Sequence, residues 1–291
     1  MIFNIIGAGR LGKHIARALI RSGQASFGGV CNKHLGRARL AVEQIGGGAA
    51  IKRVEDLPAA ELTFITTPDD CIATIVADLQ KSKHLSAGHI VVHCSGVLGS
   101  SVLAPLREQQ CHIASFHPLK AFSEGPIVDN ALRDCHCVLE GDKEALAILT
   151  PIFRSLNAHL MTINPDKKAG YHAAAVMASN YLVTLAANAA DLFLQAGMTP
   201  IQAKEITVHL MQGSLENIRQ APDMASALTG PLVRGDIATI RQHLQALDNP
   251  QTRALYEAAA IATLPLTRLD EKTANEIIQL LLSENPHRQP D

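Results

Sequence analysis

Tryptophan is absent from this 291-residue sequence, and only 3% of its residues are aromatic. A surface for single-stranded nucleic acid needs aromatic side chains on which bases stack, so this scarcity argues against one. The chain also lacks an excess of basic charge, because its formal net charge is −1. That balance creates no electrostatic attraction for nucleic acid. The sequence therefore favours a small molecule, or a second copy of the chain, as the partner.

Cysteine is scarce and scattered, and no leader of secretory type precedes the first apolar run. We therefore expect a cytoplasmic protein whose six thiols serve as small buried apolar groups. The nearest approach to a metal motif is Cys135-His136-Cys137. On a strand, His136 would point away from both cysteines, and no second ligand pair has a matching spacing. We predict no metal site.

Short apolar runs alternate with helical patterns in the first half of the chain. Strands are predicted at residues 1–7, 26–32, 61–67, 89–96, 111–118 and 135–142, and helices at residues 10–22, 35–45, 69–79 and 99–108. This alternation is typical of a mostly parallel sheet with helices on both faces. Six strands by about residue 140 predict a doubly wound, Rossmann-like sheet.

The second half shows helical patterns alone. Asp166 can cap a helix over residues 167–195, and four or five further helical segments follow. We predict an α/β domain over residues 1–163 and an all-α substrate and dimerisation domain over residues 164–291. Residues 169–190 are apolar and long enough for a membrane span, but His172, Ser179, Asn180 and Asn188 interrupt them. We prefer the buried centre of a helical domain or of a dimer.

A glycine motif lies between the first apolar run and the first helix. A lone motif of this kind is weak, but the strand before it and the helix after it are those of a dinucleotide-binding turn. Gly7 permits the tight turn, Gly9 lets the backbone approach a pyrophosphate, and Gly12 lets the helix pack against the strand. The anion then faces the N-terminus of the helix. The predicted contacts are Gly7, Ala8, Gly9, Arg10, Leu11 and Gly12.

The residues after the second predicted strand favour NADP over NAD. Asn32 occupies the position where NAD enzymes usually carry an acid for the ribose hydroxyls. Lys33, His34 and Arg37 follow it, and Arg10 of the glycine motif could reach the same phosphate. A carboxylate would repel a 2′-phosphate, whereas amide and cationic groups bind it.

Three further strand ends carry candidate residues. Since ligands bind at the carboxyl ends of the strands in this architecture, these residues are expected to line one crevice. The cofactor candidates are Thr66, Thr67, Pro68, Ser95 and Gly96, and His117 is a substrate candidate on the same rim.

Taken in order, the stretches GAGRLG, TTPDD, HCSG, SFHP, KAGYHAAAVMASNY and LTGPLVRGD resemble a bacterial family across essentially the whole chain. That family has an NADP-binding Rossmann-like domain and a helical C-terminal domain of formerly unknown function. It is similar to ketopantoate reductases, to pyrroline-5-carboxylate reductases and, more loosely, to β-hydroxyacid dehydrogenases. The resemblance implies a dimer built through the helical domain, and some members resemble an alternative ketopantoate reductase.

The resemblance also bears on individual residues. The β-hydroxyacid dehydrogenases carry a lysine, and an asparagine one helical turn later, on the first helix after the Rossmann domain. Lys168 matches that lysine, but His172 stands where the asparagine would be. The pyrroline-5-carboxylate reductases have a glycine- and threonine-rich substrate loop, and residues 229–236 match it only loosely.

Lys168, His172 and Ser179 would lie within about 40° of one another on a helix, with Asn180 further round on the same side. Hydride addition to a ketone leaves an alkoxide that needs a proton, which a lysine or histidine supplies. Our hypothesis assigns the proton to Lys168, with His172 as an alternative donor or as a relay. Asn180 and Ser179 would hold the substrate, and Arg234 would bind its carboxylate.

The sequence thus predicts an NADPH-dependent reductase of a small oxo acid, with ketopantoate as the best substrate. Reduction of a cyclic imine such as pyrroline-5-carboxylate is the alternative enzyme reaction, because an iminium accepts hydride without a strong acid. Hydride exchange with a deazaflavin would require a long apolar groove. A non-catalytic NADP sensor is the remaining alternative.

Overall fold

Eight strands form one sheet in the order β3-β2-β1-β4-β5-β6-β7-β8. Every neighbouring pair is parallel except β6 and β7. The strands are β1 (Ile2–Ile6), β2 (Ser26–Cys31), β3 (Ala49–Ile51), β4 (Leu62–Ile65), β5 (Ile90–His93), β6 (His112–Pro118), β7 (His136–Gly141) and β8 (His159–Met161). The predicted parallel α/β sheet is confirmed. The computed structural model describes residues 1–82, 84–122 and 125–283.

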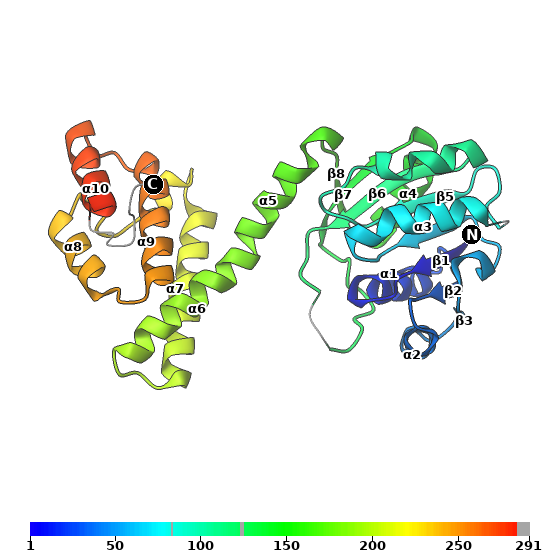
Figure 1. The fold of residues 1–291 in the computed structure, drawn as a ribbon, viewed down its shortest axis with the longest axis horizontal. Coiled ribbons are helices and arrows are strands. Elements are labelled where there is room, and N and C mark those ends of the chain that lie inside the picture. The colour runs from blue at the N-terminus through cyan, green and yellow to red at the C-terminus, as the bar shows by residue number, and fades with distance from the viewer. Residues whose placement is uncertain (83, 123–124, 284–291) are drawn as a thin grey trace. The chain divides into compact units, whose positions relative to one another are not determined.

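Helices cover both faces of this sheet (Figure 1). Side chains alternate between the faces along each strand, so Val92 packs on one side and Val91 on the other. Buried residues of α1, α2 and α4 join the first face, and those of α3 and the 3₁₀ helix η3 join the second. These helices are α1 (Arg10–Arg21), α2 (Leu35–Ile45), α3 (Ile72–Lys81), η3 (Ser100–Gln109) and α4 (Lys143–Ser155), with short 3₁₀ turns η1 (Val54–Asp56) and η2 (Asp69–Cys71).

The strand order reverses at β1. The chain goes from β1 outward to β2 and β3, and then returns to place β4 on the other side of β1. A crevice therefore opens outside the carboxyl ends of β1 and β4, which is where ligands bind in doubly wound sheets. Residues 7–12 follow β1 and residues 66–68 follow β4. The fold thus brings two of the predicted cofactor segments together.

Residues 164–283 contain helices and no strand, as predicted. This region contains the 3₁₀ turn η4 (Pro165–Lys167), helices α5 (Lys168–Ala178), α6 (Asn180–Gln195), α7 (Pro200–Gln220), α8 (Ile237–Ala246), α9 (Pro250–Thr263) and α10 (Glu271–Ser283), and the turns η5 (Ala225–Ala227) and η6 (Leu264–Leu266). Thr199 and Gln202 form a reciprocal capping box at α7, and the Asp236 carboxylate accepts from Thr239 N at the start of α8. Buried residues of α8, α9 and α10 form a separate core.

The chain divides into two compact units, Met1–Asn180 and Tyr181–Asp291. This division comes later than the domain boundary expected at residues 163–164, because α5 is grouped with the sheet. The single helix predicted over residues 167–195 is two helices, interrupted at Ser179, whose φ of −124° and ψ of −67° are not helical. By length and composition the stretch Pro165–Gln195 could cross a membrane, and none of its most apolar window is buried within the chain.

Candidate nucleotide and substrate site

The loop between β1 and α1 is built against the end of β4. Gly7 has a φ of +89°, and a Cβ there would lie 2.9 Å from Thr67 N and would overlap the Thr67 methyl group. The Thr66 hydroxyl donates to Gly7 O at 2.8 Å. A Cβ on Gly12 would overlap Thr66 Oγ1 and approach Gly7 O to 3.2 Å. Gly7 and Gly12 are therefore needed by the fold itself.

Gly9 differs from Gly7 and Gly12 because few atoms surround it. A Cβ on Gly9 would meet only Gly7 O, at 3.9 Å. Gly9 is the N-cap of α1, and no side chain caps the helix or brings an acid into its first turn. The first-turn amides and the positive end of the helix dipole are thus left for an anion.

The side chain of Thr67 also indicates that the glycine loop binds a ligand. Its Oγ1 is buried and has no hydrogen-bond partner among the described residues. A buried hydroxyl without a partner costs about 1–3 kcal/mol, so such groups usually meet a ligand or water. Thr67 lies two residues after the end of β4, and its backbone and methyl group pack against Gly7 of the glycine loop. A cofactor bound along the loop would supply the missing partner.

The segment after β2 is polar and basic at its surface. Asn32 is half-buried, whereas Lys33, His34 and Arg37 are exposed. His34 is the N-cap of α2, without a side-chain cap and without an acid in the first turn. These residues follow the strand that neighbours β1, so they lie at the same edge of the sheet as the glycine loop.

The turn after β5 is held by its own side chains. Ser95 Oγ accepts from Val97 N at 3.1 Å and Leu98 N at 2.9 Å, which makes the hydroxyl part of the turn. Ser95 N donates to His93 Nδ1 at 3.2 Å. Burial, helped by the nearby Lys168 charge, lowers the pKa of His93 to about 4. His93 is therefore a neutral structural acceptor.

A cavity of about 660 Å³ lies at the end of β6 and along α5. Small apolar side chains form much of its wall, and several polar side chains face it. The polar lining residues are His117, Lys120, Tyr171, His172, Ser179 and Asn180. Four of these six residues were predicted as catalytic or substrate residues. An apolar cavity with a few convergent polar groups is the usual form of a small-molecule site.

Gly96 lets two histidines of this cavity approach the backbone after β5. A Cβ on Gly96 would overlap His172 Nδ1 and would lie 2.9 Å from His117 Nε2. The two rings are 5.6 Å apart, centre to centre. His172 Nδ1 is buried and has no partner among the described residues. The absence of a side chain at Gly96 therefore brings two imidazole nitrogens to one place.

Lys168 lies outside the lining of this cavity and is only 1% exposed. Its ammonium donates to Ser95 O at 3.1 Å and to the Ser115 hydroxyl, and lies 3.7 Å from Glu140 Oε1. Burial lowers the pKa of Lys168, and the Glu140 carboxylate opposes that shift. Glu140 in turn accepts from Ser100 N at 2.8 Å and Ser100 Oγ at 2.6 Å. Lys168 thus ties α5 to the turn that carries Gly96.

The predicted polar helix face is therefore divided. His172 and Ser179 face the cavity, while Lys168 points into the sheet edge. Arg234 is exposed and belongs to the second unit. Tyr171 and Glu140 were not predicted from the sequence, since an isolated tyrosine and a strand glutamate belong to no motif. The spacing of Tyr171, three residues after Lys168, was the available signal.

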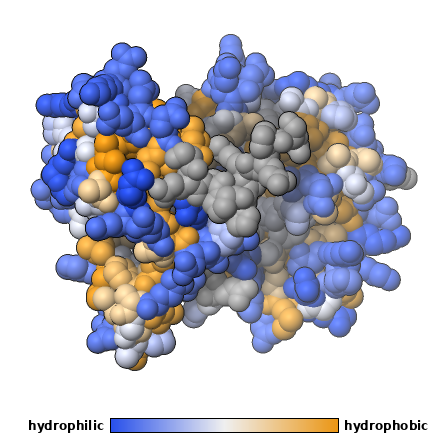
Figure 2. Space-filling view, turned by 60° about the vertical axis from the view of Figure 1, so that its left-hand side comes forward, coloured by the Kyte–Doolittle hydropathy of each residue, from blue (hydrophilic) through white to orange (hydrophobic). Residues whose placement is uncertain are grey.

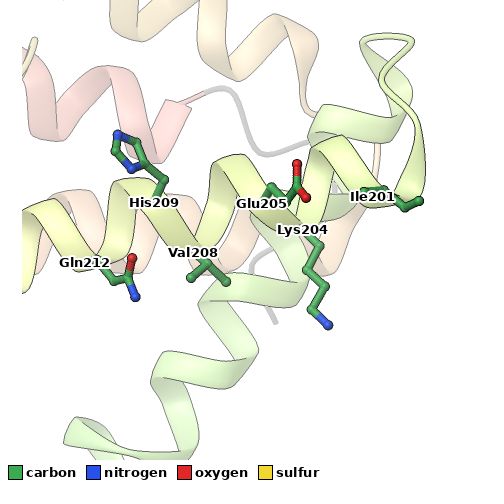
Figure 3. A pocket seen from close by; sticks show the side chains of 6 residues that line it. All are labelled: Ile201, Lys204, Glu205, Val208, His209 and Gln212. Atoms are coloured by element: carbon green, nitrogen blue, oxygen red, sulfur yellow. The ribbon is translucent and has the colours of Figure 1, made fainter.

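A second hollow, of about 470 Å³, belongs to the helical unit. All its lining residues come from α7, as Figure 3 shows: Ile201, Lys204, Glu205, Val208, His209 and Gln212. Because a single helix supplies its whole wall, this hollow lacks the convergent polar groups of the cavity at the end of β6. Among the described residues, no group of three or more His, Cys, Asp or Glu side chains could hold a metal ion.

A doubly wound sheet with a glycine loop at its switch point defines a dinucleotide-binding domain of Rossmann type. Family models agree: a Rossmann-like domain matches residues 1–118, and a domain of unknown function, DUF2520, matches residues 135–263. The chain therefore joins a Rossmann-like domain to a DUF2520 domain, as the sequence resemblance predicted. No curated protein matches this chain.

Solved structures share this architecture over nearly the whole chain. A candidate NADP oxidoreductase from Bacteroides fragilis has 22% identity and a TM-score of 0.76, covering 91% of this chain and 98% of that one. Protein TM1727 from Thermotoga maritima has 27% identity and a TM-score of 0.65, and the match covers 95% of this chain and 98% of that one. Pyrroline-5-carboxylate reductase from Streptococcus pyogenes has 17% identity and a TM-score of 0.60, and the match covers 96% of this chain and 98% of that one.

Proposed function

We propose that this protein is an NADPH-dependent oxidoreductase that reduces the carbonyl group of a small oxo acid, with ketopantoate (2-dehydropantoate) as the preferred substrate. One observation carries the proposal. The unpartnered Thr67 hydroxyl at the glycine loop and the histidine-lined cavity at the end of β6 both lie at the carboxyl ends of strands of one sheet. Cofactor and substrate would thus both bind at the carboxyl ends of the strands.

The residues present fit NADP(H). The α1 N-terminus and the backbone at Gly9 suit a pyrophosphate, and the Thr67 hydroxyl suits a ribose or nicotinamide group. Asn32 with the basic residues after it suits a 2′-phosphate, which a carboxylate would repel. The similarity to a candidate NADP oxidoreductase supports the same choice. When bound, the nicotinamide would supply a hydride.

The proton that completes the reduction would come from His172. His172 lines the cavity and its Nδ1 has no partner among the described residues, whereas the ammonium of Lys168 is occupied by Ser95 O, Ser115 Oγ and Glu140. Lys168 would act indirectly, by holding the Ser95–Gly96 turn against α5. The geometry therefore favours His172 over Lys168, the first choice of the sequence analysis.

The substrate itself would be held by the remaining polar lining. His117 would bind the carbonyl oxygen, and Ser179 and Asn180 a hydroxyl or carboxylate. Lys120, on the cavity wall, is a candidate cation for the substrate carboxylate, and Arg234 stays the other proposed one. A carboxylate substrate needs one such charge-assisted contact for orientation.

The test is NADPH oxidation by purified protein at high enzyme concentration, with ketopantoate as substrate. Oxidation that depends on ketopantoate would support the proposal. No oxidation, in protein shown to bind NADPH, would contradict ketopantoate. The same assay with pyrroline-5-carboxylate then tests the alternative, imine reduction, which the similarity in fold to the Streptococcus pyogenes reductase favours. Tight NADPH binding without turnover of either compound would favour a sensor.

The helical unit, we further propose, forms a homodimer. Large apolar side chains of this unit are exposed along α6 and α7, among them Val183 at 69% and Ile201 at 70%. Figure 2 shows hydrophobic residues gathered on the helical unit. Monomers rarely expose so much contiguous apolar surface. A second copy would cover this surface and complete the one-sided hollow on α7.

We also propose a cytoplasmic location. All six cysteines are free thiols, and five of them are buried. Free thiols persist where the compartment is reducing, which supports the cytoplasm over an oxidising compartment.

A further inference from the structure

A tyrosine and a histidine are paired inside the candidate cavity. The Tyr171 hydroxyl lies 2.8 Å from His117 Nδ1, with the two rings 5.7 Å apart and nearly perpendicular at 88°. His117 belongs to β6 and Tyr171 to α5, and both line the cavity. The sequence separates them by 54 residues. Only the packing of α5 on the sheet edge creates this pair.

Protonation decides what the pair can do. Burial, together with the nearby His172 and Lys168, lowers the pKa of His117 to about 4, and Asp69 opposes this shift. Burial also raises the pKa of Tyr171 to about 12. At neutral pH the imidazole is therefore uncharged, with one nitrogen as donor and the other as acceptor, and the phenol keeps its proton.

The direction of the hydrogen bond follows from the available acceptors. The Tyr171 hydroxyl has no other hydrogen-bond partner among the described residues. Its proton is satisfied only if it donates to His117 Nδ1, which places the imidazole proton on Nε2. His117 Nε2 is the nitrogen that approaches Gly96, next to His172 Nδ1. The donor N–H thus faces the place where the cavity meets the turn after β5.

We propose that Tyr171 is a positioning residue that holds His117 as the Nε2–H tautomer, so that this N–H donates a hydrogen bond to the carbonyl oxygen of the substrate. The inference rests on the proposed function and narrows its substrate class. A ketone oxygen accepts this bond and accepts it more strongly as negative charge develops during reduction. A protonated cyclic imine has no lone pair on nitrogen to accept it. The site therefore suits an oxo acid and disfavours an iminium.

The first test reads the tautomer directly and needs no activity. Long-range ¹H–¹⁵N correlation spectra of the full-length protein with ¹⁵N-labelled histidine distinguish the two tautomers, and His117→Gln identifies the signal. We expect the Nε2–H form in the wild type and a mixture of tautomers in Tyr171→Phe. An Nδ1–H form in the wild type, or an unchanged tautomer in Tyr171→Phe, would overturn the proposal.

The helical unit offers a matched control. The Tyr256 hydroxyl lies 2.9 Å from His243 Nδ1, with the rings 5.9 Å apart at 86°, nearly the same geometry as the cavity pair. Tyr256→Phe removes an equivalent hydroxyl outside the candidate site. We expect it to alter the His243 signals and to leave both the His117 tautomer and the turnover of ketopantoate unchanged.

The second test uses NADPH oxidation with ketopantoate and with pyrroline-5-carboxylate. Tyr171→Phe should lower kcat for ketopantoate about tenfold with little change in the KM for NADPH, and His117→Gln combined with it should add little further. Loss of tautomer control should affect the imine less than the ketone. An unchanged kcat for ketopantoate, or an equal loss for both compounds, would overturn the inference. A wild type that oxidises NADPH with neither compound contradicts the proposed function instead, while the tautomer spectra still decide the pairing.

Discussion

The Lys168 ammonium lies 3.7 Å from Glu140 Oε1, and both side chains are almost completely buried. The pair joins the first helix after the sheet to the strand β7. Each charge has further partners, with Ser95 and Ser115 on the lysine and Ser100 on the glutamate. A charge pair at this depth depends on both members, because either one alone would be a buried, uncompensated ion.

Removing one member of this pair should destabilise the protein strongly. Lys168→Met leaves the Glu140 carboxylate unpaired, at a cost of about 3 kcal/mol in the free energy of unfolding. The melting temperature in calorimetry should then fall by roughly 6–12 °C. Lys168→Met combined with Glu140→Gln should lose less than the sum of the two single variants. Strict additivity would show that the two side chains do not interact.

Gly96→Ala should reduce turnover without unfolding the protein. The added methyl group would collide with His172 Nδ1 and crowd His117 Nε2, so both rings must move away from the turn. We expect at least a tenfold loss of kcat for NADPH-dependent ketopantoate reduction, with a melting temperature close to that of the wild type. Gly170→Ala is the matched control on α5, since nothing lies within 4 Å of the added Cβ. Equal activity of the two variants would argue against the histidine cluster.

Arg37→Glu should weaken NADPH binding much more than NADH binding. The new carboxylate would repel the extra phosphate, and a tenfold change corresponds to about 1.4 kcal/mol. Titrations that follow the fluorescence of each bound nucleotide measure both affinities. Lys143→Glu, at the start of α4, makes the same change in net charge elsewhere. A similar loss for both nucleotides would place the 2′-phosphate away from α2.

His89 should make the protein less stable in mild acid. Its ring is 1% exposed, with Nε2 2.9 Å from Thr63 Oγ1, and burial lowers its pKa to about 4. The unfolded chain takes up a proton near the ordinary histidine pKa of 6.5, whereas the folded protein does so only near 4. Stability is therefore complete above pH 6.5 and decreases, by up to about 3 kcal/mol, as the pH falls to 4.

Melting temperatures at pH 7.5 and pH 4.5 test this linkage. His89→Gln keeps a hydrogen-bonding side chain but cannot take up the proton, so the variant should lose less stability between the two pH values than the wild type. An equal acid-induced loss in both proteins would show that His89 does not contribute.

Val183→Glu should convert the proposed dimer into a monomer. The side chain is 69% exposed on α6, and a charge there would be buried against the second copy. Light scattering after gel filtration should give about twice the chain mass of 31.1 kDa for the wild type, and one chain mass for the variant. Ile148→Glu, on an exposed apolar position of α4, should leave the mass unchanged. A monomeric wild type would contradict the dimer.

The parts of the fold that were predicted correctly have strong local signals. The helix α2 was predicted at its observed bounds, and the six longer strands were found because each lies in a mostly apolar stretch. The helix α4 was missed, although it is 13 residues long. The strands β3 and β8 have three residues each, too few to show a pattern. The helix expected at residues 99–108 is a 3₁₀ helix with Pro105 inside it, where an α-helix would lose a hydrogen bond.

The same contrast between local patterns and long-range contacts holds for the site residues. Gly7, Gly9 and Gly12 form a local motif, so the sequence by itself located the loop, whereas the contacts of Gly7 and Gly12 with Thr67 and Thr66 come from the fold. Tyr171 depends on His117, 54 residues away in the chain, and Lys168 on Ser95, 73 residues away, so only the tertiary structure decided their roles. Helical periodicity placed Lys168 and His172 on one face of the helix. In the packed structure the lysine side chain points at Ser95, Ser115 and Glu140 of the sheet domain, whereas His172 lines the cavity. Charge burial and long-range hydrogen bonds are properties of packed surfaces, and no local pattern encodes them.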